Sequence, residues 1–597
     1  MTDADPLGSP LVWDADGGPR SRRFGDIYFS KENGLGEARL VFLEGCDLPK
    51  AWRERTRSTV AELGLGAGVN VAALLDLWER CGPPHAHLHI LSVESDPISR
   101  DDARRALGAW PEIASAAEAL IERWPGRARG FHRLDFPERR AIIDVAVMDV
   151  GSALADWDGT ADAWFLDGFS PALNPEMWSP SVLSAVARRS NPGARAATYT
   201  VAGSVRRGLA DAGFALRRAP GFGRKRERLE ASLPGAAVDP PAPSVAIVGA
   251  GIAGASLCRA FRALGVEPML FDAVGAGAGA SGAPAALAAP RLDAGLGPGA
   301  ALFAQASRRA RDLYRTTAKA VVGSGALQIA MSPKDDARFS TIAGSDLFEP
   351  GAMSLHPQPG GRNGLSMKDA VTVNPKTVIA AWTPTVMVAS IHDLAFESGR
   401  WRLLDELGTA VAEVDCVCLA NGLDASRLSP GLELTAVRGQ ATVAEGLVRS
   451  EALVFGGYAI PTRDGVMIGA THERGDTSTE PRPEEQARNL AGLASVDPDL
   501  AGQIDPSRLW DWCGVRATTS DYLPLAGEAT DSPAGLWVLS GLGSRGFCLA
   551  PLLAEHIAAR ALGCPSPLPN SLAALVDPGR FAARARRRGR PERSKSE

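Results

Sequence analysis

Short apolar runs that end in a glycine-rich turn or in an acidic residue recur along this chain, separated by segments with apolar residues at helical spacing. The first run begins at Ser58 and leads through alternating glycines into a helical pattern that starts near Val69. A second apolar run follows and ends at Glu94. Strand, turn, helix and strand in this order predict an open α/β sheet covered by helices.

The same order of elements returns in the second half of the chain. Ser244–Ala273 predicts a strand, a glycine turn, a helix and a second strand, and Gly535–Leu562 predicts a strand, a turn and a helix. We expect the chain between these two segments to form a β-rich domain that recognises the substrate. We therefore expect an α/β and α+β multidomain protein.

A cluster of prolines in the segment Leu233–Ser244 predicts a linker, because prolines and small residues resist both helix and strand. We expect a first domain at 1–235, a linker at 236–243 and a second domain at 244–575. The last residues, 576–597, are dense in arginine and predict a disordered basic tail, with a polyphosphate-binding arm as the alternative.

Composition narrows the class of protein. The net charge of −5 is not that of a polycation, so any contact with nucleic acid must come from local basic patches. The eight cysteines form no CxxC pair, which argues against a zinc ribbon or a disulfide framework. The N-terminus lacks the features of a signal peptide, and no apolar run is long enough to span a membrane. These observations predict a cytoplasmic protein without membrane contact, and we favour a monomer.

Three histidines alternate at His85, His87 and His89, a spacing that places them on one face of a strand. They have no acidic or cysteine partner nearby in the sequence, so we interpret them as incidental and expect no metal.

The first glycine turn has the pattern Glu62-x-Gly64-x-Gly66-x-Gly68, which lets the backbone approach a ligand closely. It lacks the dinucleotide spacing GxGxxG and resembles motif I of class I methyltransferases, which bind S-adenosylmethionine (SAM). An acid at the end of the second strand commonly binds ribose hydroxyls. A plain structural turn is the alternative. The candidate SAM residues are Glu62, Gly64, Gly66, Gly68, Glu94 and Asp149, the last at or near the end of a further predicted strand.

The segment Asp162–Pro171 predicts an apolar strand that ends in Asp167 and is followed by Gly-Phe-Ser-Pro. This arrangement resembles the motif IV position of N-methyltransferases. An amine nucleophile must lose a proton and direct its lone pair at the methyl group, while an aromatic ring stacks on the planar or cationic group. We therefore predict Asp167 and Phe169 as catalytic residues. The alternative makes Asp167 a helix N-cap and Phe169 a core residue.

The segment Thr198–Leu229 is strongly basic and includes Gly-Phe-Gly-Arg-Lys-Arg. A charge run is usually a solvated face, but here it closes a methyltransferase-like domain. We therefore predict that Arg224, Lys225 and Arg226 contact a phosphate backbone.

The turn after residue 244 has the pattern Gly249-x-Gly251-x-x-Gly254, with a strand before it, a helix after it and Asp272 at the end of the next strand. The glycines permit the approach of a pyrophosphate to the helix N-terminus, and the acid accepts from a ribose hydroxyl. This context predicts a dinucleotide site that is best suited to FAD.

Two further segments favour a flavoenzyme. The Gly/Ala/Ser-rich loop Gly275–Pro290 is typical of flavin oxidases, and the C-terminal turn directs a helix N-terminus at the flavin ring. We expect a Rossmann domain of the D-amino-acid-oxidase type, with FAD-binding parts at about 244–300 and 510–565 and a substrate part at about 300–510. The candidate FAD residues are Gly249, Gly251, Gly254, Asp272, Ser281, Gly543, Arg545 and Gly546.

Arginines within the middle and late segments are candidate partners of a substrate carboxylate or phosphate, because the guanidinium binds such groups in a bidentate manner. They are Arg438, Arg463, Arg516 and Arg545. Each alone is more often structural, and we expect at least one to face the substrate.

Several longer strings make the chain similar to the MnmC family of bifunctional tRNA-modifying enzymes. These strings are Asp26–Gly45, Asp162–Trp178, Gly221–Glu227, Val437–Gln440, Gly469–Thr477 and Gly543–Glu555. The resemblance implies that the C-terminal domain uses FAD to remove the carboxymethyl unit from 5-carboxymethylaminomethyl-(2-thio)uridine at the wobble position of tRNA. It also implies that the N-terminal domain then methylates the resulting primary amine from SAM.

The chain departs from the family pattern at one place, where Ala283 and Pro284 follow Gly282 instead of the usual Asn. Because of this departure, one alternative function is an active methyltransferase joined to an inactive or altered oxidase. The other is a small-molecule N-methyltransferase fused to a flavoenzyme of the glycine or D-amino-acid-oxidase type.

Overall fold

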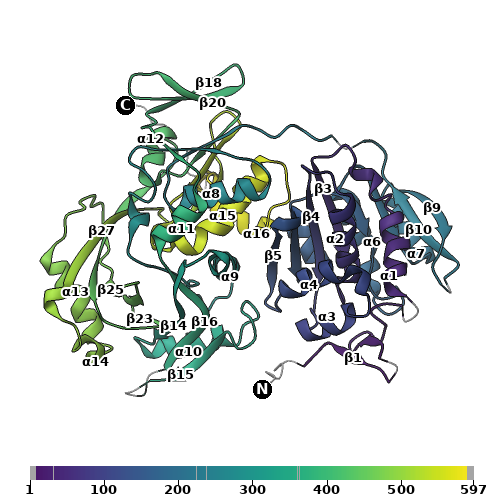
Figure 1. Ribbon diagram of the computed structural model, residues 1–597, viewed down its shortest axis with the longest axis horizontal. Coiled ribbons are helices and arrows are strands. Elements are labelled where there is room, and N and C mark those ends of the chain that lie inside the picture. The colour runs from purple at the N-terminus through teal and green to yellow at the C-terminus, as the bar shows by residue number, and fades with distance from the viewer. Residues whose placement is uncertain are drawn as a thin grey trace. The chain divides into compact units, whose positions relative to one another are not determined.

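The structure is a computed structural model that describes residues 8–15, 17–30, 33–223, 225–236, 238–358, 361 and 363–587 (Figure 1). It divides into two compact units, Met1–Pro241 (unit 1) and Ala242–Glu597 (unit 2), and the division falls within the proline-rich segment. In the described residues no helix is both long enough and apolar enough to cross a bilayer.

Unit 1 is built on an eight-stranded sheet with the order β5-β6-β4-β3-β7-β8-β10-β9. The five strands from β6 to β8 in this order are parallel, and β5, β10 and β9 run antiparallel to their neighbours. The strands are β3 (Arg57–Leu63), β4 (His87–Glu94), β5 (Gly130–Phe136), β6 (Ala141–Val147), β7 (Ala161–Phe165), β8 (Ser190–Thr198), β9 (Ala215–Pro220) and β10 (Glu227–Ser232), with a separate hairpin of β1 (Leu11–Trp13) and β2 (Pro19–Ser21). The central strands are buried along almost their whole length because both faces of the sheet are covered.

Helices cover the two faces of this sheet, and each face has its own buried core. One core joins the sheet to α1 (Gly34–Ala38), α2 (Val69–Cys81), α3 (Arg100–Leu107) and α4 (Ala114–Glu122). The other joins it to α5 (Val150–Asp156), α6 (Pro180–Arg188) and α7 (Gly203–Asp211). The predicted helix start near Val69 is confirmed, since Gly68 is the N-cap of α2.

No acidic residue lies near the three alternating histidines in the sequence, but the fold gives His89 an acidic partner. Its Nε2 atom lies 2.7 Å from Asp144 Oδ2 on β6, and Arg133 on β5 donates two hydrogen bonds to the same carboxylate. The partners were missed because they lie more than 40 residues away along the chain. In the described residues no group of three or more His, Cys, Asp or Glu side chains is arranged to hold a metal.

Unit 2 contains a six-stranded sheet with the order β17-β12-β11-β21-β29-β28. Its strands are β11 (Val245–Val248), β12 (Met269–Asp272), β17 (Val386–Val388), β21 (Cys416–Leu419), β28 (Leu525–Glu528) and β29 (Leu536–Ser540). All neighbours are parallel except β28 and β29. The helices of this region are α8 (Ile252–Ala263), α9 (Pro298–Thr316), α11 (Pro375–Trp382), α12 (Ala425–Leu428) and α15 (Gly546–Ala561). The expected open sheet with a parallel core is thus present in each unit.

The middle of unit 2 forms a ten-stranded, mostly antiparallel sheet. Its strands are β13 (Ala286–Ala288), β14 (Val321–Ile329), β15 (Met353–Pro357), β16 (Asn363–Val373), β22 (Thr435–Glu445), β23 (Ala452–Val454), β24 (Tyr458–Pro461), β25 (Gly465–Gly469), β26 (Glu473–Arg474) and β27 (Leu509–Thr518). Helices α10 (Pro333–Ala343), α13 (Pro483–Ala494) and α14 (Pro498–Ala501) accompany it, and β18 (Asp393–Glu397), β19 (Arg400–Leu404) and β20 (Ala410–Val414) form a separate small sheet.

The prediction that residues 576–597 are disordered is wrong for residues 576–587, which are folded. Helix α16 (Asn570–Val576) is followed by α17 (Arg580–Arg587). Arg580 and Arg584 both pair with the Asp521 carboxylate, which gives this arginine-rich segment a folded partner. The remaining residues, 588–597, lie outside the described residues.

Candidate active sites of the two units

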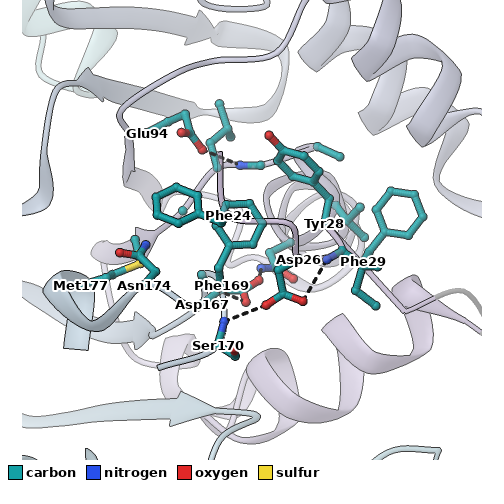
Figure 2. A pocket seen from close by; sticks show the side chains of 18 of the residues that line it. Phe24, Asp26, Tyr28, Phe29, Glu94, Asp167, Phe169, Ser170, Asn174 and Met177 are labelled. Atoms are coloured by element: carbon teal, nitrogen blue, oxygen red, sulfur yellow. Dashed lines mark hydrogen bonds between the residues drawn. The ribbon is translucent and has the colours of Figure 1, made fainter. Parts of the chain in front are cut away.

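Unit 1 contains a pocket of about 370 Å³ at the carboxyl ends of the parallel strands β3, β4 and β7 (Figure 2). Its walls come from the glycine turn after β3, the end of β4, the segment after β7 and residues 23–42. Ligands of open α/β sheets bind at this edge. The predicted residues that line the pocket are Gly64, Gly66, Glu94, Asp149, Asp167, Phe169 and Lys225, whereas Glu62 and Gly68 are not among the lining residues.

The glycine turn holds the acid at the end of β4 against the pocket. Gly64, Gly66 and Gly68 have φ angles of 104°, 52° and 78°, a region that other residues rarely adopt. The Gly66 amide donates to Glu94 Oε2 at 3.1 Å, and burial raises the pKa of Glu94. A carboxylate beside an open glycine turn fits the ribose and amino-acid parts of SAM.

Glu62 and Asp149, the two other predicted SAM residues with acidic side chains, have different surroundings. Glu62 is buried behind it, and Ser92 Oγ donates to Glu62 Oε2 at 2.6 Å, whereas Oε1 has no hydrogen-bond partner in the described structure. Burial raises the pKa of Glu62 to about 8, which favours the protonated acid at neutral pH. Asp149 is the N-cap of α5 and accepts from the Ser152 amide at 2.9 Å. Asp149 therefore has a structural task as well as a place at the pocket.

Asp167 lies two residues after the end of β7 and points into the pocket (Figure 2). Its Oδ1 accepts from the Gly168 amide at 2.8 Å, and its Oδ2 accepts from Asn70 Nδ2 at 2.7 Å. Desolvation raises the pKa of Asp167 to about 6. Sequence reasoning missed Asn70, although it lies two residues after Gly68, in the first turn of α2. Near neutral pH the carboxylate that Asn70 and the Gly168 amide hold is therefore ionised, yet basic enough to accept a proton.

Aromatic rings form the wall beside Asp167. The Phe169 ring lies 5.0 Å from Phe24 and 5.3 Å from Tyr28, measured between ring centroids. Asp26 Oδ2 accepts from the Ser170 amide at 2.9 Å and so joins the N-terminal segment to the loop after β7. Figure 2 shows these side chains around one space. Phe24 and Tyr28 were not predicted as site residues, and only Tyr28 lies within the string Asp26–Gly45.

Lys225 lies at this pocket rather than on an open basic face. Its Nζ atom is 2.7 Å from Glu37 Oε1 and 3.9 Å from the centre of the Tyr199 ring. Tyr199 in turn donates to the Gly168 carbonyl at 2.5 Å. Lys225 is therefore joined to the loop that bears Asp167, and its predicted phosphate contact stays a prediction. Arg226 is exposed, and Arg224 lies outside the described residues.

In unit 2 the three glycines of the turn after β11 differ in the space that a side chain would have at each position. Gly249 has a φ of 106°, and a Cβ atom there would lie 2.5 Å from the Ala420 carbonyl oxygen. A Cβ on Gly254 would overlap the Gly249 carbonyl oxygen. At Gly251 the nearest atom would be Ser281 Oγ, 3.0 Å away, at the N-terminus of α8. Packing thus demands the first and third glycines, and the middle one leaves space for a pyrophosphate at the helix N-terminus.

The loops around this turn are held by Asp272 and Ser281. Asp272 accepts from the amides of Ala250, Val274 and Gly275 at 2.8 to 2.9 Å. Ser281 Oγ accepts from the first amide of α8 at 3.0 Å. Beside Gly249, the Oδ1 atom of Asn421 is buried and has no hydrogen-bond partner among the described residues. An unused acceptor next to a glycine turn fits the adenosine part of FAD, and sequence reasoning missed it.

The C-terminal turn leads into α15 at Gly546, after a short 3₁₀ turn at Gly543–Arg545. Arg545 Nη1 donates to the Ala289 carbonyl at 3.0 Å, which joins the turn to the chain after β13. An isolated bridge between Thr518 and Leu542 joins the same turn to the end of β27. The N-terminus of α15 therefore meets the substrate sheet, as a flavin site between the two sheets requires.

Arg438 lies fully inside the protein. Its side chain forms an ion pair with Glu485 on α13 and donates to the carbonyls of Ser478 and Glu480. Because it is 0% exposed, it does not reach a substrate. Arg463 is exposed and donates to Thr377 Oγ1 at 2.7 Å.

Arg516 on β27 is the candidate that is partly buried and has no acidic side chain paired with it in the described chain. Its Nη2 donates to the Thr471 carbonyl at 3.1 Å. A Cβ on Gly439 would overlap the Arg516 guanidinium, so the glycine makes room for it. Tyr458 on β24 lies close enough to influence the pKa of Arg516, which burial lowers. These residues form a cationic site without a protein counter-ion.

Both cofactor sites have the donors and the glycine turns that their cofactors need, so the two units define a SAM-dependent methyltransferase joined to an FAD-dependent oxidoreductase. Two family models agree: an S-adenosyl-L-methionine-dependent methyltransferase matches residues 111–234, and an FAD dependent oxidoreductase matches residues 244–560. The predicted cofactors and fold classes are thereby confirmed.

The chain belongs to the MnmC family. It is 53% identical to a relative from Caulobacter sp. (strain K31), over 97% of this chain and 99% of the relative, and 52% identical to one from Caulobacter vibrioides, over 97% and 98%. A relative from Maricaulis maris is 41% identical over 97% of each chain. All three are named tRNA 5-methylaminomethyl-2-thiouridine biosynthesis bifunctional protein MnmC.

Proposed function

We propose that this protein modifies the wobble uridine of tRNA in two steps, an oxidation in unit 2 and a methylation in unit 1. The observation that carries the proposal is the full-length similarity to relatives whose name states tRNA 5-methylaminomethyl-2-thiouridine biosynthesis, because it spans both units. The exposed Arg226 and the neighbouring Arg224 are the proposed phosphate contacts.

In the first step the substrate is the secondary amine of a 5-carboxymethylaminomethyl group. Bound FAD would accept two electrons from the amine, and water would then release the carboxymethyl unit as a two-carbon oxo acid. Arg516 binds the substrate carboxylate, because its guanidinium lacks an acidic partner in the described structure. Gly439 makes room for this guanidinium, and Gly469 lies on the same face of the sheet.

In the second step the primary amine is the nucleophile, and SAM would supply the methyl group. Asp167 accepts the N–H groups of the amine and takes the proton that leaves with methyl transfer. Asn70 and the Gly168 amide fix the carboxylate, so its free lone pairs face the pocket. The rings of Phe24, Tyr28 and Phe169 exclude water and stack on the base.

Nucleoside analysis tests this function. Purified protein is incubated with tRNA from a strain that lacks the activity, with and without SAM. We expect 5-aminomethyl-(2-thio)uridine without SAM and 5-methylaminomethyl-(2-thio)uridine with it. Unchanged wobble uridine, together with turnover of free glycine or another small amine, would instead establish a small-molecule enzyme.

Replacing Arg516 by alanine should lower kcat/KM of the oxidation by about 100-fold, because the carboxylate loses its charged, bidentate partner. Methyl transfer to tRNA that already bears the primary amine should be unchanged. The matched control is Arg463→Ala, which removes an exposed arginine of the same sheet. Equal losses in both variants would contradict the role of Arg516.

Methyl transfer should fall as the pH drops through about 6, because Asp167 must be ionised to accept the proton and its pKa is raised to that value. Lys225 lowers the pKa of Asp167 and Glu37 raises it. The acid limb of the rate profile should therefore move to higher pH in Lys225→Met and to lower pH in Glu37→Gln. Stopped assays at constant ionic strength measure both, and shifts in the same direction would exclude this coupling.

A further inference from the structure

Tyr522 is an aromatic residue with an unusual placement in unit 2. Its side chain is 53% exposed, and its φ angle of 59° lies in the left-handed region that non-glycine residues rarely adopt. It lies four residues after the end of β27, the strand that bears Arg516. An exposed ring on a strained backbone has a cost in stability, which suggests that its position serves binding.

The loop around Tyr522 is held firmly. Asp521 Oδ1 accepts from Thr519 Oγ1 at 3.0 Å and from the Leu523 amide at 3.2 Å. Arg580 and Arg584 on α17 donate to the same carboxylate at 2.9 Å and 2.6 Å. The backbone of the loop is therefore held in place and loses little entropy when a ligand binds.

The neighbours of Tyr522 are cationic and open to solvent. The Arg474 guanidinium lies 5.5 Å from the centre of its ring, and Arg474 is exposed. Arg474 and Arg516 both oppose Val437 in the sheet, on β26 and β27, so their side chains leave from the same face. The exposed ring therefore contacts an arginine that shares its face of the sheet with Arg516, the residue that we assign to the substrate carboxylate.

The connection to the flavin side is equally close along the chain. Thr518, four residues before Tyr522, pairs with Leu542 in the turn that leads into α15. The loop of Tyr522 is thus at the border between the proposed reaction site and solvent, where the rest of a large substrate would lie.

We propose that Tyr522 and Arg474 form a stacking site for an RNA base that neighbours the reacting uridine, with Arg474 next to its phosphate. The proposal rests on the proposed function and adds a substrate subsite to it. Every base has a flat face that stacks on tyrosine, and a single-stranded loop supplies such bases together with negative charge. An amine substrate without an RNA chain would have nothing to place on this ring.

Binding of an anticodon stem-loop RNA with 2-aminopurine next to the wobble position tests the stacking directly and needs no catalysis. The full-length holoenzyme and its Tyr522→Phe variant should quench the fluorescence, since both keep the ring. Tyr522→Ala should bind about 10-fold more weakly and quench little. No quenching by the wild type, or equal quenching by Tyr522→Ala, would overturn the stacking site.

Kinetics then locate the site relative to the reaction. In Tyr522→Ala the KM for tRNA in the oxidation should rise about 10-fold with kcat nearly unchanged. The control Phe396→Ala removes another exposed ring of unit 2, 40% exposed on β18, and should leave KM unchanged. Equal effects of both variants would overturn the proposal. A wild type that binds and quenches the RNA but leaves tRNA unmodified would instead contradict the proposed function alone.

Discussion

Replacing Asp167 by asparagine is expected to lower the rate of methyl transfer by about 10³-fold and to leave flavin reduction intact. The amide cannot take the proton of the amine, and general bases contribute on the order of 10² to 10⁴ to such rates. The variant also has a single oxygen where two donors converge, the Gly168 amide and Asn70 Nδ2. One of these donors would lose its acceptor, so the residue would also be less well fixed.

Single-turnover transfer from labelled SAM to tRNA that bears the primary amine measures this effect. The control is Asp101→Asn, whose side chain is 89% exposed on α3, away from the pocket. A loss of SAM affinity with an unchanged transfer rate would assign Asp167 to cofactor binding. Transfer near the wild-type rate would show that Asp167 is neither base nor anchor.

Gly251→Val is expected to empty the FAD site. In the free protein the added side chain meets only Ser281 Oγ nearby, at 3.0 Å from the new Cβ, so the fold should survive. The same side chain would fill the approach of the pyrophosphate to the N-terminus of α8. The ratio of flavin to protein, read from the absorbance spectrum, should fall from about one to below about a tenth.

The matched control is Gly279→Ala in the neighbouring loop, where an added Cβ would meet no atom within 4 Å. It should purify with its flavin. Thermal unfolding monitored at the tryptophans separates loss of FAD from loss of fold. If the Gly251→Val protein still purified with bound flavin, the pyrophosphate would not lie against this glycine.

The sequence was sufficient for features that depend on neighbours along the chain. The glycine turns at Gly64–Gly68 and Gly249–Gly254, with the acids Glu94 and Asp272 at the ends of the next strands, follow from strand–turn–helix spacing. Each such motif has its ligand-binding geometry within about 30 residues, so composition and spacing suffice to predict it.

Contacts between distant segments could not be predicted in this way. Asp26 and Ser170 are 144 residues apart, and nothing in either segment indicates that they share a pocket. Lys225 lies in a basic run and was assigned to phosphate, yet its ammonium is paired with Glu37 of the first helix. The pattern of charges along the sequence shows which side chains can form ion pairs, but their partners depend on the fold.

The alternation along β22 has a consequence for how this enzyme tolerates change in its sequence. Arg438 points to α13 and Gly439 to the opposite face, beneath Arg516, and ten consecutive pairs from Thr435↔Thr518 to Ala444↔Leu509 fix this register. Inserting or deleting one residue in the strand would exchange the two faces. A buried guanidinium would then occupy the floor of the substrate site and leave Glu485 without its partner. Conservative substitutions within this strand should therefore be tolerated far better than any change in its length.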